Sequence, residues 1–95
     1  MANKDGQLDS TEDRLTVEEL ATLTGLSTGV IRRLISLEVI DPDMIEPEPR
    51  FRPETVVRVR KIRRLHVELG VSWSSMPLVL DLLARINYLE SRIRE

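Results

Sequence analysis

The side chains that could carry chemistry in this sequence are charged, and they are distributed unevenly along the chain. The loop at residues 39–49 holds four acids and no base: Asp41, Asp43, Glu46 and Glu48. Carboxylates in this number attract a basic surface and steer its approach. Three prolines stiffen the same loop and reduce the entropy that docking would remove: Pro42, Pro47 and Pro49. We expect this loop to dock on a basic protein, and a solvated surface loop is the alternative.

Basic side chains follow directly after this loop. Residues 50–64 contain one acid, Glu54, and these bases: Arg50, Arg52, Arg58, Arg60, Lys61, Arg63 and Arg64. They either contact the phosphates of a nucleic acid or form the solvated face of an amphipathic helix. Because the preceding acids would repel phosphate, nucleic-acid binding is the second interpretation.

Several classes of chemistry have no residues to support them. The absence of cysteine excludes a disulfide framework, a thiolate zinc site and a cysteine nucleophile. One histidine, His66, cannot build a histidine metal cluster, and the sequence has no phosphate-binding loop or hydrolase motif. We therefore expect no enzyme, cofactor or metal. No apolar run approaches the ~20 residues of a membrane span, and the start lacks a signal-peptide core, so a cytoplasmic location is expected.

Two short helices are predicted ahead of the acidic loop. The first has a capping-box pair, Thr16 and Glu19, and spans about residues 17–24. Its apolar stripe consists of Val17, Leu20, Ala21 and Leu23. The second follows an N-cap at Ser27 and spans about residues 28–37. Two short helices joined by a glycine-containing turn form a helix-turn-helix.

The prolines exclude a central strand from the acidic loop, but Val39–Ile40 and Phe51 could pair as a small wing hairpin. Pro53 is predicted as the first residue of a third helix that Gly70 ends. Its inward face is expected to contain Val56, Val59, Ile62, Leu65 and Leu69. Trp73 is expected to pack between this helix and the next.

The last helix starts after Ser72 or Ser75, because Pro77 is tolerated only near a helix start. Its apolar residues step by three and four, as in a short coiled-coil seam: Val79, Leu82, Ile86, Leu89 and Ile93. A seam this short needs support, so it packs on the domain, on a second copy in a homodimer, or on both.

Length and composition limit the whole to one small domain. With 95 residues and 3% aromatics, the core must consist mainly of Leu, Ile and Val, which suits packed helices. We predict an all-α (mostly α) fold in three parts. These are a disordered tail at 1–13, a winged helix-turn-helix domain with a small wing hairpin at 14–76, and a C-terminal dimerisation helix at 77–95.

The stretch "LTVEELATLTGLSTGVIRRLISLEVIDP" resembles the winged helix-turn-helix of MerR-type regulators. The residues that carry the likeness are Thr24, Gly25, Leu26, Ser27, Arg32 and Pro42. "RFRPETVVRVRKIRRLHVELGVSWSSM" resembles the second half of the same domain, and together the likeness covers about residues 15–93. The chain departs from the pattern at Arg33 and Leu34, where the family usually has two tyrosines, and at Glu38, where it usually has glycine.

One branch of that superfamily fits the second half more closely. "RRLHVELGVSWSSMPLVLDLLARINYLE" is similar to the chaperone modulator family CbpM. The matching residues are Glu68, Leu69, Trp73, Leu80, Leu82, Ile86 and Leu89, and Trp73 is the most specific of them. The resemblance implies a protein that binds the J-domain of a CbpA- or DnaJ-type co-chaperone and inhibits its stimulation of a DnaK-type chaperone.

Three functions therefore compete. As a J-domain-binding modulator, the chain would present these acids to the partner: Glu18, Glu19, Asp41, Asp43, Glu46 and Glu48. As a MerR-type transcription regulator, it would contact DNA through Thr28, Arg32, Arg33, Arg50 and Arg52. The third possibility is a purely structural dimerisation module.

Overall fold

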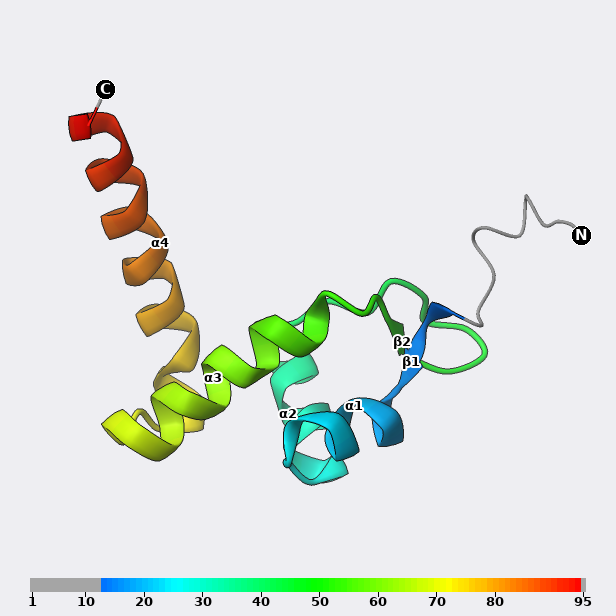
Figure 1. Ribbon diagram of the computed structural model, residues 1–95. Helices are drawn as coiled ribbons and strands as arrows, with labels where there is room; N and C mark the ends of the chain where they lie inside the picture. Colours follow the sequence, from blue (N-terminus) through cyan, green and yellow to red (C-terminus); the bar gives the residue numbers. More distant parts are fainter. Residues whose placement is uncertain (1–12, 95) are drawn as a thin grey trace, which may run out of the picture.

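The computed structural model describes residues 13–94, which form a mostly helical chain with one small antiparallel ribbon (Figure 1). The elements are β1 (Leu15–Thr16), α1 (Val17–Thr24), α2 (Thr28–Ser36), β2 (Arg50–Phe51), α3 (Thr55–Leu69), the 3₁₀-helix η3 (Trp73–Ser75) and α4 (Met76–Arg94). The predicted all-α (mostly α) class and the winged helix-turn-helix are confirmed. The tail predicted at residues 1–13 lies outside the described residues, apart from Asp13.

The first two helices begin as the sequence predicts. The Thr16 hydroxyl accepts a hydrogen bond from the Glu19 backbone N–H at 3.0 Å, and the Glu19 carboxylate accepts one from the Thr16 N–H at 2.9 Å. This reciprocal capping box fixes the start of α1. Gly25, at φ 76°, supplies the left-handed residue that ends α1. The Ser27 hydroxyl then caps α2 by accepting from Val30 N–H at 3.1 Å.

The end of α2 is a Schellman turn built on a residue other than glycine. The Val39 N–H donates to the Leu34 carbonyl at 3.2 Å, and the Glu38 N–H donates to the Ile35 carbonyl at 2.9 Å. Together these two hydrogen bonds define the Schellman motif. In this motif the residue just after the C-cap adopts the left-handed conformation. Glu38 is that residue, at φ 62°.

The wing pairs differently from the prediction. In the antiparallel ribbon, Phe51 of β2 lies opposite Leu15 of β1, and Thr16 lies opposite Arg50. Inside the wing, Arg50 also forms an isolated bridge with Met44, whose carbonyl accepts from Arg50 N–H at 2.9 Å.

The predicted pairing of Phe51 with Val39–Ile40 is therefore wrong. The Schellman turn directs Val39 and Ile40 into the core, where both are buried. The strand that does pair with Phe51 precedes α1, so the ribbon ties the start of the domain to the end of the wing.

The third helix begins two residues later than predicted. Thr55 N–H donates to the Arg52 carbonyl at 2.9 Å, so the residues around Pro53 form a turn that leads into α3. Gly70, at φ 71°, ends the helix as predicted. The inward face of α3 is correct for Val59 and Ile62 but wrong for Leu69, which is 72% exposed at the last helical position.

Residues 70–75, here called the elbow, connect α3 to α4. The Trp73 indole stacks on the His66 imidazole with ring centroids 3.8 Å apart and an 18° interplanar angle. His66 Nδ1 lies 2.7 Å from the Val71 carbonyl oxygen. Because a carbonyl only accepts, Nδ1 must carry a proton and donate. Ser72 caps η3, and α4 starts at Met76, which leaves Pro77 in the first turn where no N–H is required.

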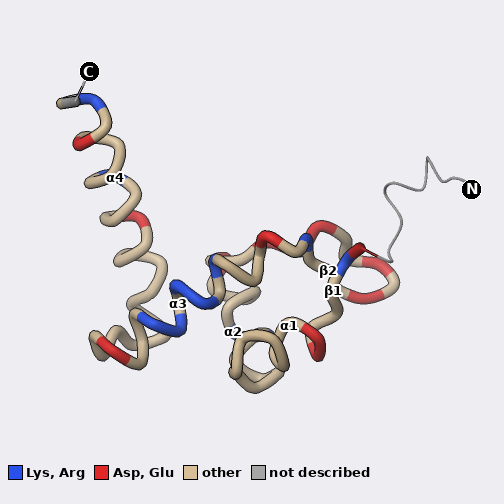
Figure 2. The backbone as a smooth tube through the Cα atoms, in the orientation of Figure 1, with Lys and Arg blue, Asp and Glu red and all other residues tan. Residues whose placement is uncertain are grey.

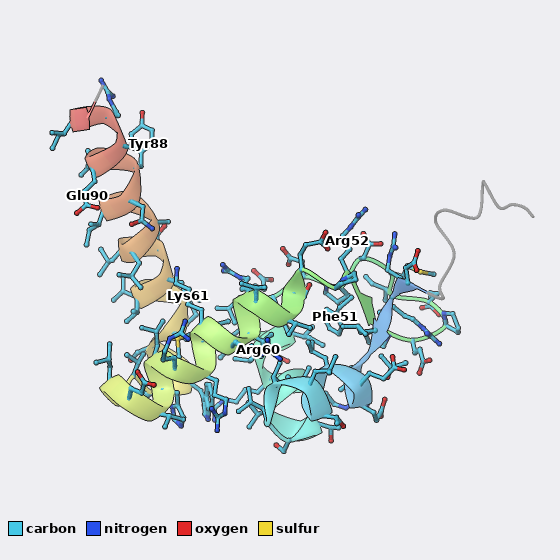
Figure 3. The ribbon with its side chains drawn as sticks, viewed as in Figure 1. Phe51, Arg52, Arg60, Lys61, Tyr88 and Glu90 are labelled. Atoms are coloured by element: carbon cyan, nitrogen blue, oxygen red, sulfur yellow. The ribbon has the colours of Figure 1, made fainter. Side chains whose placement is uncertain are left out.

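One core joins all these parts. Its fully buried side chains are Leu20, Ile31, Leu34, Phe51, Val59, Ile62 and Met76. Phe51 reaches the core from β2 (Figure 3). Met76, the first residue of α4, is also fully buried in it. Beyond its first turns, α4 extends away from α1, α2 and α3 (Figure 1). The domain therefore positions an acidic wing at one end and a projecting helix at the other.

Candidate protein-interaction surface

The six acids predicted to bind a partner lie on two neighbouring elements. Glu18 and Glu19 occupy the first turn of α1, and the other four lie in the wing loop, residues 39–49. Because β1 runs directly into α1 and pairs with β2 at the end of the wing, both groups lie at one end of the molecule. Figure 2 shows acids at this end and bases along α3.

The Asp43 carboxylate is already paired with two arginines of the same chain. It accepts from the Arg14 guanidinium and, at 3.0 Å, from Arg52 Nε. The hydrogen bond from Arg14, followed by that from Arg52, lowers the pKa of Asp43 despite some loss of hydration. Arg14 was not among the residues expected to act in the wing. Asp43 therefore holds the wing to the segment before β1.

The other five acids differ in whether their carboxylates already pair with groups of the same chain. Glu48 pairs with Arg50 at 2.7 Å, and Glu19 serves the capping box. Glu18 has only a loose contact, 3.8 Å to Arg32, between two side chains that are more than half exposed. Asp41 and Glu46 are exposed, and among the described residues neither has a basic group within 4.0 Å. The open carboxylates are therefore those of Glu18, Asp41 and Glu46.

An apolar depression lies beside Glu18 and was not anticipated from the sequence. This α1 hollow has a volume of about 380 Å³ and is lined by Leu15, Glu18, Glu19, Thr22 and Leu23. Leu23 belongs to the predicted apolar stripe of α1, but it does not join the core, because it is 48% exposed. Thr24 is buried instead, and its hydroxyl donates to the Leu20 carbonyl at 2.7 Å. The available signal was the spacing of Glu19 and Leu23, which lie four positions apart and so share one face of α1.

The residues predicted to bind DNA separate into two groups. Thr28, Arg32 and Arg33 are exposed on α2, the second helix of the helix-turn-helix. Arg50 and Arg52 instead pair with Glu48 and Asp43 inside the wing. The structure brings the first group together on one helix and commits the second to holding the wing.

Two bases of α3 bond to backbone carbonyls of the helix-turn-helix. Arg58 Nε donates to the Val39 carbonyl at 2.6 Å, and Arg60 donates to the Leu23 carbonyl at 3.3 Å. Helix α1 has no basic residue in its last turn, so Arg60 places positive charge at the negative end of that helix dipole. Arg60 and Lys61 both project from the middle of α3 (Figure 3). These contacts give Arg58 and Arg60 structural roles, which neither of the two interpretations of the basic residues included.

The seam of α4 is largely uncovered in the single chain. Val79 is half-buried, whereas Leu82, Ile86, Leu89 and Ile93 are 47% to 82% exposed. Tyr88 and Glu90, on the same half of α4, stand away from the rest of the protein (Figure 3). Within one chain, therefore, the predicted packing of the seam on the domain is limited to its start.

Residues 13–94 lack two structural features. None of the helices there has the length and apolar character needed to cross a membrane. In the same residues, no three His, Asp or Glu side chains are grouped so that they could hold a metal ion.

Comparison with known proteins gives the family. No curated protein matched the chain. The family model described as "MerR HTH family regulatory protein" matches residues 15–95. That match begins at β1 and includes the helix-turn-helix, the wing, the elbow and α4. The capped helix pair, the wing ribbon and this match agree, and the chain belongs to the MerR helix-turn-helix family of regulatory proteins.

Proposed function

We propose that this protein is a chaperone modulator of the CbpM type, which binds the J-domain of a DnaJ- or CbpA-type co-chaperone. Binding would cover the basic J-domain helix and so inhibit stimulation of a DnaK-type chaperone. The observation that carries the proposal is the open negative charge of Glu18, Asp41 and Glu46 at the wing end, beside an apolar hollow. The similarity of the elbow and α4 to CbpM, centred on Trp73, supports it.

The acids have unequal roles in this proposal. Asp43 and Glu48 are neutralised by arginines of the wing and shape it, so they contribute little attraction. The three open carboxylates steer the partner and pair with its bases. Attraction between exposed charges is screened over about 8 Å at physiological salt, so binding should weaken as salt rises.

The experiment is a calorimetric titration of a purified J-domain with charge-reversal variants of the full chain. The test variant carries Asp41→Lys and Glu46→Lys, and the control carries Glu68→Lys and Glu90→Lys. Both change the net charge equally, and all four acids are exposed. At low salt, Kd of the test variant should rise about tenfold or more, while the control stays within about twofold. Equal effects of the two variants would contradict a localised acidic surface.

A DNA-binding regulator is the second candidate, because α2 exposes Arg32 and Arg33 with no acid in that helix. Two observations oppose it: Arg50 and Arg52 are held by carboxylates, and Glu18 and Glu19 lie in the first turn of α1. The test is retardation of genomic DNA fragments at low salt. A regulator would retard some fragment, and Arg32→Ala with Arg33→Ala would reduce that retardation.

Either function is compatible with a homodimer through α4, which we propose from the exposed seam. Paired seams of two copies would bury the apolar side chains that one chain leaves in water. Light scattering during size-exclusion chromatography would then give a mass near twice the chain mass of 10.9 kDa. A mass of one chain across the micromolar range would exclude this dimer.

A further inference from the structure

We infer that the α1 hollow receives an apolar side chain from an amphipathic basic helix of the protein partner. This inference rests on the proposed function and identifies the contact that would be most sensitive to substitution. It places the centre of the interface on α1, beside Glu18 and Glu19, whereas the sequence gives the acids of α1 and of the wing loop equal weight.

The floor of the hollow is apolar and firmly supported. Leu15 is half-buried and held in the ribbon opposite Phe51, which is fully buried. Leu23 lies near the other end of α1. Its backbone carbonyl accepts a hydrogen bond from Arg60, and this bond fixes that end of the helix. Between them, Thr22 presents a short side chain. A site formed by a capped helix and a ribbon needs little rearrangement before binding, which favours affinity.

The rim of the hollow determines which partner fits. Glu18 is exposed and only loosely paired, and Glu19 has one carboxylate oxygen in the capping box, at 2.9 Å from Thr16 N. Both charges are negative, so a phosphate backbone or an acidic helix would be repelled. A lysine or arginine of the partner can pair with Glu18 while a neighbouring apolar side chain enters the hollow.

The dimensions of the hollow suit one face of a helix. Along α1 the lining runs from Glu18 to Leu23, about 7.5 Å at a rise of about 1.5 Å per residue, and Leu15 of β1 extends it beyond the start of the helix. A partner helix covers that distance in two turns and presents an apolar residue and a base three or four positions apart. The hollow therefore accepts one apolar anchor flanked by basic residues.

The test compares two leucine substitutions in the full chain. Leu23→Ser removes apolar surface from the hollow, and Leu69→Ser removes it from an exposed position on α3 outside the hollow. Two probes are titrated: a purified J-domain, and a synthetic helix with leucines on one face and lysines on the other. For both probes, Leu23→Ser should raise Kd about tenfold and Leu69→Ser should change it less than about twofold. Methyl NMR signals of Leu15 and Leu23 should shift on binding.

The outcomes separate this inference from the proposed function. If the J-domain binds and Leu23→Ser raises Kd no more than Leu69→Ser does, the proposed function stands, but the hollow is not the docking site and the inference is overturned. If the J-domain does not bind but the synthetic helix shifts Leu15 and Leu23, the hollow stands and the J-domain function fails. If nuclear Overhauser contacts in the free chain join Leu8 to Leu23, the occupant is the chain's own N-terminal segment and the inference is overturned.

Discussion

Replacing Glu38 with glycine should stabilise this protein. Glu38 holds the left-handed position of the Schellman turn after α2, at φ 62°. A residue with a Cβ loses about 1–2 kcal/mol in that conformation. Glycine avoids this strain, but its greater freedom in the unfolded chain removes about 0.5–1 kcal/mol of the gain. The expected net stabilisation for Glu38→Gly is about 0.5–1 kcal/mol, or about 3–6 °C in Tm for a domain of this size.

The matched control is Glu38→Ala, which removes the carboxylate but keeps the strained backbone. Glu38 is exposed, so loss of its charge alone should change stability by less than about 0.5 kcal/mol. Urea unfolding followed by far-UV circular dichroism gives both values at one temperature. Equal stability of the glycine and alanine variants would refute the strain argument, because backbone conformation is the property in which they differ.

Three further predictions concern the cap, the wing and α4. Thr16→Ala should destabilise the chain by about 1 kcal/mol in urea unfolding, because the capping box loses its hydroxyl acceptor, whereas Thr16→Ser should retain most of the stability. The lowered pKa of Asp43 implies a stabilising contribution that is present above its unfolded pKa of about 3.9 and lost as pH falls through the folded value. Asp43→Asn should therefore reduce stability at neutral pH and flatten the acid limb of a stability–pH curve. If α4 forms the proposed dimer, Ile86→Lys should shift the light-scattering mass toward a single chain, whereas Tyr88→Lys, off the seam, should leave the mass of two chains unchanged.

Local signals in the sequence were sufficient for the helix-turn-helix. The Thr16–Glu19 pair and Ser27 mark helix starts that the structure confirms, and Gly70 marks a confirmed end. These features depend on bonds between residues three or four positions apart, which spacing alone reveals. Trp73 was expected between the third and fourth helices, and it stacks on His66 of α3.

The features that the sequence did not reveal depend on distant partners. The strand opposite Phe51 lies 36 positions earlier, at Leu15, and nothing in the local pattern selects it over Val39–Ile40. Composition likewise gave every acid of the wing loop the same role, whereas Arg14 neutralises Asp43 across 29 positions. Leu23 is exposed because of the orientation of α1 about its own axis when it packs on α2 and α3. The apolar stripe of an eight-residue helix defines that orientation poorly.

The elbow also gives the protein a built-in optical reporter. Trp73 is the single tryptophan of the chain, and it lies against His66 where α3 turns into α4. Its emission therefore monitors this one junction, while circular dichroism averages over every helix. If the two unfolding curves coincide, the long terminal helix and the domain melt as a unit. If emission changes first, the projecting arm detaches while the winged domain remains folded.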